Sequence, residues 1–146
     1  MKTILTFMIL FIASVSFTQT KEHRLDKWLS DCMEKDGSTM GMILCSDTAA
    51  VLWDKELNTV YDLLMNNLGE NARNALRDSQ REWIKFRDKE FEAIDAYYTY
   101  IYEIMEGGTM YPMLAAGARM EVIRKRALEL TAMYDELNAH LGNSDE

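Results

Sequence analysis

Two cysteines and two histidines are the residues of this chain best suited to nucleophilic or metal chemistry. Cys32 and Cys45 lie in the first third of the sequence, whereas His23 and His140 lie near opposite ends. A Ser-His-Asp or Cys-His site needs a histidine beside its nucleophile, so both ends of the chain would have to build one site. A zinc site would need more ligands than these four residues supply. The sequence predicts neither kind of site.

Carboxylates and methionines are the other candidates for chemistry. Acid–base catalysis needs two carboxylates held in a cleft with separated pKa values, and no spacing here singles out a pair. Met40 with Met42, and Met110 with Met113, carry soft sulfur that can bind Cu(I), although methionine more often fills gaps between helices. We expect no enzyme activity, cofactor or metal, and a metal or small-ligand carrier stays an alternative.

The first twenty residues have the order of a secretory signal peptide. Lys2 precedes an apolar run from Ile4 to Phe17, which is followed by small or polar residues and is short for a membrane span. We predict a signal peptide over residues 1–18, with cleavage between residues 16 and 20. The mature chain is then exported, periplasmic or secreted, and is not inserted in the membrane.

Export changes how the cysteines are interpreted. In an oxidising compartment Cys32 and Cys45 are expected to form a disulfide bond. Closing a loop of this size stabilises a fold by roughly 3 kcal/mol in the chain-entropy model.

Length and charge restrict the class of protein further. A chain of 146 residues with 48% hydrophobic content fits one domain with an ordinary core. The formal charge is −8, and it becomes −9 when Lys2 leaves with the signal peptide. Such a charge disfavours nucleic acid and anionic lipid, and it favours solubility or a basic partner.

The scarcity of helix breakers indicates an all-α fold. The only proline is Pro112. We expect helices over 22–35, from Ser38 or Thr39 to about 68, over 71–105 and over about 113–141. Gly69 should end the second helix, and Gly107 and Gly108 the third. The prediction is an antiparallel helical bundle of one short and three long helices, a single domain over 22–141 stapled by one disulfide, with a disordered tail over 142–146.

Residues 79–91, SQREWIKFRDKEF, combine aromatic and charged side chains. Helical spacing places Trp83 and Phe86 in the core and Arg87 near Trp83.

Gln80 and Arg87 are expected to join Asn58 in a polar network that fixes helix register, with Glu56 or Asp54 as further members. The alternative is a polar recognition pocket.

Four tyrosines follow on the same expected helix, at Tyr97, Tyr98, Tyr100 and Tyr102. Their positions point around most of the helix circumference, so they cannot all be core. Exposed tyrosines favour a contact surface for a partner or for a second subunit.

Several sequence blocks carry a family resemblance. After the two cysteines come WDKELNTVY (53–61), LRDSQREWIKFRDKE (76–90), GGTMYPM (107–113) and AAGARMEVIRKRALEL (115–130). In this order, over about residues 32–130, they resemble the LprI-type lysozyme inhibitor domain of small exported bacterial proteins. The resemblance implies a helical envelope protein whose namesake inhibits lysozyme, and it offers no catalytic residues to carry over.

The residues that match the family signature mostly look like determinants of the fold. They are Asp54, Leu57, Asn58, Tyr61, Gln80, Trp83, Phe86, Arg87, Gly107, Gly108, Tyr111 and Pro112. Many relatives have a second cysteine pair at the places that hold Phe91 and Ala118 here. The resemblance therefore implies that packing of a large residue against a small one replaces a second disulfide.

The leading functional hypothesis is an exported inhibitor that occludes the cleft of a basic lysozyme through an acidic surface. Its expected contact residues are Glu106, Gly107, Gly108, Thr109, Tyr111, Tyr98 and Tyr102. The rival hypothesis is a non-catalytic adaptor or structural module of the envelope, dimeric through the tyrosine-rich helix.

Overall fold

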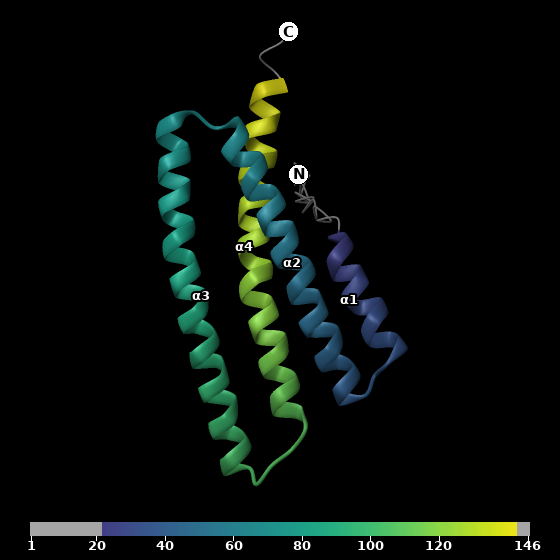
Figure 1. Ribbon diagram of the computed structural model, residues 1–146. Coiled ribbons are helices and arrows are strands. Elements are labelled where there is room, and N and C mark those ends of the chain that lie inside the picture. The colour runs from purple at the N-terminus through teal and green to yellow at the C-terminus, as the bar shows by residue number, and fades with distance from the viewer. Residues whose placement is uncertain (1–21, 143–146) are drawn as a thin grey trace, which may run out of the picture.

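Four helices make up the part of the chain that the computed structural model describes, residues 22–142. They are α1 (Arg24–Lys35), α2 (Thr39–Asn67), α3 (Glu70–Ile104) and α4 (Met110–Gly142), and this part contains no strand (Figure 1). The predicted all-α fold is confirmed. The predicted signal peptide and residues 143–146 lie outside the described residues. None of the helices between residues 22 and 142 has the length and apolar character needed to cross a bilayer.

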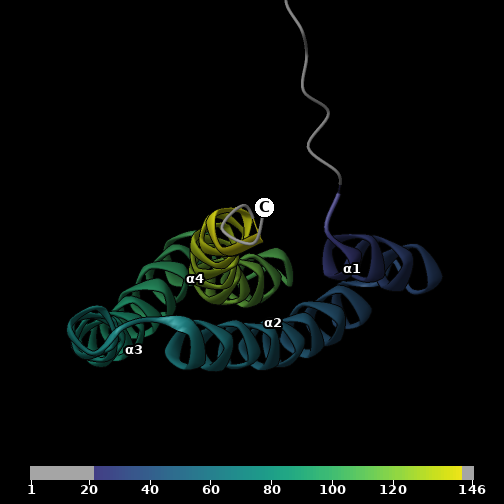
Figure 2. The same cartoon turned by 90° about the horizontal axis from the view of Figure 1, so that it is seen from above.

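The helices do not all pack on one another. α2 and α4 run parallel and form the most extensive contact, α1 packs antiparallel on α2, and α3 packs antiparallel on α4. α3 makes few contacts with α2, because the two helices diverge from their shared turn. Seen from above, α4 lies over the row formed by α3 and α2, and α1 lies at the other end of that row (Figure 2). One side of α3 is therefore left without a neighbouring helix.

The core lies between α2 and α4. It is centred on Trp53, Leu57 and Leu64 of α2 and on Ala127 and Leu130 of α4, each at most 1% exposed. Burying one large apolar side chain stabilises the fold by roughly 1.5–3 kcal/mol. α4 contributes a stripe of apolar residues at steps of three and four, Ala116, Met120, Ile123, Ala127 and Leu130, all of them buried. Leu141 continues the spacing expected from the sequence, but it is 45% exposed.

The helix ends follow from local sequence. The Ser38 side chain caps α2 by accepting a hydrogen bond from the Gly41 N–H at 3.0 Å, as predicted. α2 ends directly before Gly69, as expected, but not through a left-handed glycine. The C-cap of α2 is Leu68 in an extended conformation, and Gly69 is the N-cap of α3 with φ −67°, so its left-handed freedom is not used.

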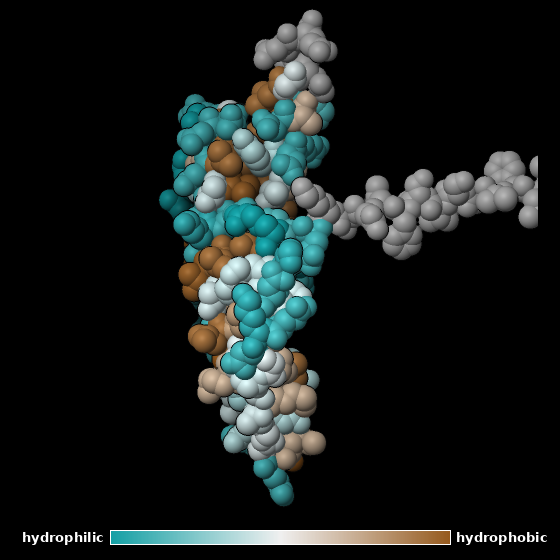
Figure 3. All heavy atoms as spheres, turned by 90° about the vertical axis from the view of Figure 1, so that its right-hand side faces the viewer, coloured by the Kyte–Doolittle hydropathy of each residue, from teal (hydrophilic) through white to brown (hydrophobic). Residues whose placement is uncertain are grey.

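A disulfide and ion pairs attach α1 to the rest of the fold. The predicted disulfide joins Cys32 to Cys45, with Cα atoms 5.9 Å apart. Asp26 accepts hydrogen bonds from Nε and Nη2 of Arg124 on α4, at 2.7 and 2.8 Å. On the face that α1 and α2 turn outward, apolar residues form separate patches among polar ones (Figure 3).

Candidate partner-binding site

The turn between α3 and α4 is the most projecting part of the described chain. This segment, Met105–Thr109, is called the tip below, and it extends beyond the turn between α1 and α2 (Figure 1). Gly107 and Gly108 have φ 107° and 126°, as expected for glycines that end a helix, and Glu106 has φ 56°. The Gly107 N–H donates to the Tyr102 carbonyl at 2.8 Å, which fixes the path of the turn.

Apolar and acidic side chains lie in the tip and on the helix ends beside it. Ile104, Met105 and Met110 are each more than half exposed, and the carboxylates of Glu103 and Glu106 are exposed beside them. At its other end the Thr109 hydroxyl lies 3.3 Å from that of Thr39, which attaches the tip to the start of α2.

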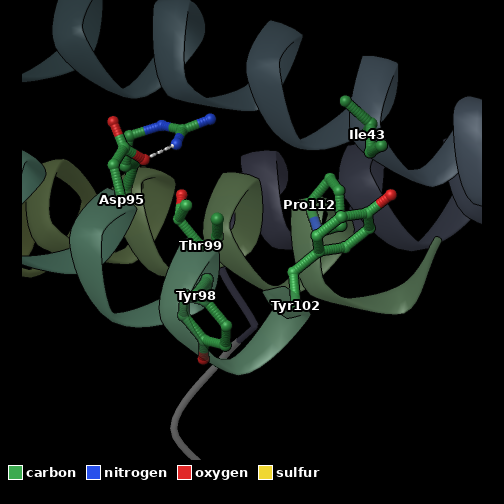
Figure 4. Close-up of a pocket in the computed structure, with 8 residues that line it drawn as sticks. Ile43, Asp95, Tyr98, Thr99, Tyr102 and Pro112 are labelled. Atoms are coloured by element: carbon green, nitrogen blue, oxygen red, sulfur yellow. Dashed lines mark hydrogen bonds and ion pairs between the residues drawn. The ribbon is translucent and has the colours of Figure 1, made fainter. Parts of the chain in front are cut away.

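A surface pocket of about 390 Å³ lies next to the tip, between α2, α3 and α4 (Figure 4). Its walls are mostly apolar, with the Tyr102 ring beside Pro112 and with Ile43 opposite. An ion pair between Asp95 and Arg119 lies at one end. The pocket can accommodate an apolar group flanked by a polar one.

A second pocket of about 420 Å³ shares Tyr98 with the first, so this ring separates the two. Three methionines line it: Met33, Met42 and Met113. Met40, in contrast, is 73% exposed. Among residues 22–142 no group of histidine, cysteine and carboxylate side chains could hold a metal ion.

The structure separates the predicted contact residues into two groups. Glu106, Gly107, Gly108 and Thr109 form the tip, and Tyr102 lines the pocket beside it.

Two further contact candidates are less available to a partner than expected. Tyr98 is half-buried between the two pockets, and Tyr111 is half-buried in the first turn of α4. The most exposed tyrosines are Tyr97 and Tyr100, which were not among the expected contacts. Only the spatial positions of α2 and α4 reveal which side of α3 is covered.

The segment 79–91 is only partly core. Trp83 is half-buried against the core cluster, whereas Phe86 is 54% exposed, so the prediction that Phe86 is a core residue is wrong. The reason is that α4 covers one side of α3 and α2 diverges from it. The Arg87 guanidinium lies 5.7 Å from the centre of the Trp83 ring, as expected, and 6.0 Å from that of Phe91.

The predicted polar network does not form. Gln80 is buried, but its partner is Arg126 on α4, whose Nε donates to Gln80 Oε1 at 3.1 Å. Arg87 instead binds Asp88, the residue after it.

The other expected members of that network also have different partners. Asn58 donates to the carbonyl and the carboxylate of Asp54 within α2, at 2.9 and 3.1 Å. Glu56 binds Arg24 and approaches His23. Sequence reasoning missed Arg126, although this charged residue lies beside the apolar stripe of α4, directly before Ala127, and that position was the available signal.

The proposed replacement for a second disulfide stays a prediction. Phe91 packs against the core cluster, and Ala118 lines the second pocket.

Comparison with known proteins identifies one family and two similar proteins. A family model described as lysozyme inhibitor LprI matches residues 30–130. An uncharacterized protein of Rhizobium meliloti (strain 1021) is 33% identical over 118 residues, which cover 72% of this chain and 79% of that protein. The crystal structure of an uncharacterized protein from Burkholderia thailandensis superimposes with a TM-score of 0.65 at 28% identity, over 82% of this chain. The chain spans 58% of the length of that solved protein.

Proposed function

The chain belongs to the LprI family of lysozyme inhibitors, and we propose on this basis that it is an exported binding protein that inhibits a lysozyme by occluding its cleft. The family match over residues 30–130 is the observation that carries the proposal, because it includes all of α2 and α3 and most of α4.

The tip is the part of the fold that we assign to the enzyme cleft. It projects, so it can enter a concave site that the rest of the bundle cannot reach. Its backbone is ordered by the bond from Gly107 to Tyr102, so little conformational entropy is lost on binding. Glu106 occupies a left-handed conformation that costs an L-residue about 1–2 kcal/mol, and such strain concentrates at binding sites.

Charge supports a basic lysozyme as the partner. The mature chain carries −9, so it attracts a cationic enzyme at long range, and added salt weakens that attraction. The pocket beside the tip then accepts an apolar side chain from the rim of the cleft, next to Asp95 and Arg119.

A cell-wall lysis assay tests the inhibitory activity. The purified mature chain is titrated into lysozymes of several classes at low and high salt. Inhibition at or below the micromolar range, weaker at high salt, is the expected result. Absence of inhibition of every class at that concentration would rule the proposal out.

Two variants of equal charge test the role of the tip. Glu106→Lys alters the tip, and Glu70→Lys alters the opposite end of α3. Both change the long-range charge by the same amount, so only a local contact distinguishes them. We expect Glu106→Lys to weaken inhibition at least about tenfold more than Glu70→Lys. Equal effects of the two variants would mean that only the net charge matters, and they would exclude the tip as the contact.

A further inference from the structure

The last turns of α3 carry apolar or aromatic residues on most sides. Between Ala96 and Ile104 the only charged residue is Glu103. A helix of this composition is normally buried all round. Here one side of the helix is left unpacked. Its residues Tyr97, Tyr100 and Ile104 are 59%, 62% and 57% exposed.

The exposed residues form a regular row. With Ala93 they follow one another in steps of four, three and four residues, the spacing of a coiled-coil seam. At about 100° per residue, this row lies on the side of α3 away from Thr99 and Tyr102, which line the pocket.

One side chain of the row, Tyr97, already packs against a neighbour. The Tyr97 ring packs edge-on against Tyr98, with ring centres 5.1 Å apart. Tyr98 itself is half-buried where the two pockets meet. A second protein can therefore pack on the row without first ordering this side chain.

We propose that this row, Ala93, Tyr97, Tyr100 and Ile104, is the interface through which two copies of the chain form an antiparallel dimer. A two-fold axis between Tyr97 and Tyr100 places Tyr97 of one copy against Tyr100 of the other. The same axis places Ala93 against Ile104 of the other copy. The seam then has four contact pairs. In two of them Tyr97 faces Tyr100, and in the other two Ile104 faces Ala93.

Charge opposes this pairing, but only over distances and at sites where the repulsion is screened or offset. The two Glu103 carboxylates lie about 14 Å apart along the helix axis in this register, beyond the Debye length of about 8 Å at physiological salt. Glu103 of one copy also comes level with Glu92 of the other, within about 3 Å along the axis. Lys89 is paired with Glu92 and offsets part of this repulsion, and salt screens the rest together with the net charge of −9 on each copy. Salt therefore strengthens the dimer, whereas it weakens binding to a basic lysozyme.

The small size of the interface argues for a weak, transient dimer. The exposed parts of the four side chains amount to on the order of 400–500 Å² on each copy, below the roughly 800 Å² of a standard interface. We therefore expect a dimer with a Kd in the micromolar range.

Sedimentation of the mature chain between about 1 and about 100 µM tests the proposal. We expect a monomer–dimer equilibrium that shifts toward dimer as salt is added. Tyr100→Ala should raise the Kd at least about tenfold, and Tyr102→Ala, the same change on the pocket side of α3, should leave it within about twofold. A monomer at the highest concentration, or equal effects of the two variants, would overturn the interface.

Cysteine pairs test the register. Under mild oxidation, a mixture of Ala93→Cys and Ile104→Cys chains should form a covalent dimer, and each variant alone should not. The native cysteines do not interfere, because both are in the disulfide. Cross-linking of each variant with itself would exclude the antiparallel arrangement. Neither experiment involves a lysozyme, so its outcome is independent of the inhibitory activity.

Discussion

Arg126 on α4 donates a hydrogen bond to the buried side chain of Gln80 on α3, with Nε and Oε1 3.1 Å apart. Its Nη2 also donates to the Ser79 hydroxyl at 3.3 Å. Few buried side chains of α3 face α4, since only Leu76 and Gln80 are buried on this helix. This polar contact therefore fixes the register of α3 on α4.

Replacing Gln80 with leucine should destabilise the protein. The change keeps the volume but removes the acceptor for a largely buried guanidinium, which costs about 1–3 kcal/mol in the free energy of unfolding. Urea denaturation measures the effect. Asn58→Ala is the matched control, because its bonds stay within the exposed side of α2, and it should change the free energy by no more than about 0.5 kcal/mol. A larger effect at Asn58 than at Gln80 would contradict the assignment.

The bridge between Asp26 and Arg124 should make the free energy of unfolding depend on pH in the acidic range. The hydrogen bonds from Arg124 lower the pKa of Asp26 below its ordinary value of 3.8 and raise the pKa of Arg124. A carboxyl group with a lowered pKa stabilises the fold above its ordinary pKa, and this contribution is lost as the pH falls through the lowered value. Asp26→Asn should therefore cost about 1–2 kcal/mol near pH 7, because the bridge is partly exposed.

The pH series provides the control for this prediction. Unfolding curves of the original chain and of Asp26→Asn should converge as the pH is lowered below about 4. Curves that keep a constant separation would mean that the loss comes from packing and not from the charge of Asp26.

Removing the disulfide should release α1 first. The double change Cys32→Ala with Cys45→Ala should lower the free energy of unfolding by roughly 3 kcal/mol. Hydrogen exchange should rise more in α1 than in α4, because α1 lies at the edge of the bundle. The reduced original chain should behave like the double variant. A double variant much less stable than the reduced original chain would indicate that packing of the buried Cys45 side chain matters more than the disulfide bond.

Glu106→Gly should stabilise the chain although it removes a side chain from the tip. Glycine adopts φ 56° without steric cost, so we expect a gain of about 0.5 kcal/mol after its larger unfolded-state entropy is included. Glu103→Gly, in the helical part of α3, should instead lose about 1 kcal/mol. Thermal unfolding distinguishes the two. Destabilisation by Glu106→Gly would show that the Glu106 side chain makes a contact that outweighs the strain.

Gly41→Ala should destabilise the start of α2. An added Cβ would lie 2.3 Å from Cγ and 2.6 Å from the carbonyl oxygen of Asp36, so the turn before α2 has to move, at a cost of about 1–3 kcal/mol. Gly117→Ala is the control, because nothing lies within 4 Å of the new Cβ and alanine favours a helix by about 0.5–1 kcal/mol. We expect Gly41→Ala to lower the free energy of unfolding and Gly117→Ala to raise it.

Local signals predicted the elements of this fold well. On α4 the buried residues Met120, Ile123, Ala127 and Leu130 alternate steps of three and four, the spacing that puts them on one side of a helix. The cap at Ser38 and the positive φ angles of Gly107 and Gly108 also depend on neighbouring residues alone.

The sequence could not predict which side of α3 is covered. This helix carries apolar residues on more than one side, so periodicity supports Phe86 as core as readily as Trp83. Which side of α3 is buried depends on the divergence of α2 from α3. The partner of Gln80 was hidden for a similar reason, because Arg126 is 46 residues away and meets it only when α4 packs on α3.

The parallel packing of α2 and α4 sets the order in which the chain can fold. α1 and α2 are made first and can pair early, since the disulfide joins residues close in sequence. The apolar side of α2 that carries Trp53 and Leu57 finds its main partner only in α4, after the whole of α3 has been synthesised. Such late, long-range contacts slow folding. A chain that ends before α4 leaves this side of α2 uncovered, so it should be a substrate for chaperones and proteases.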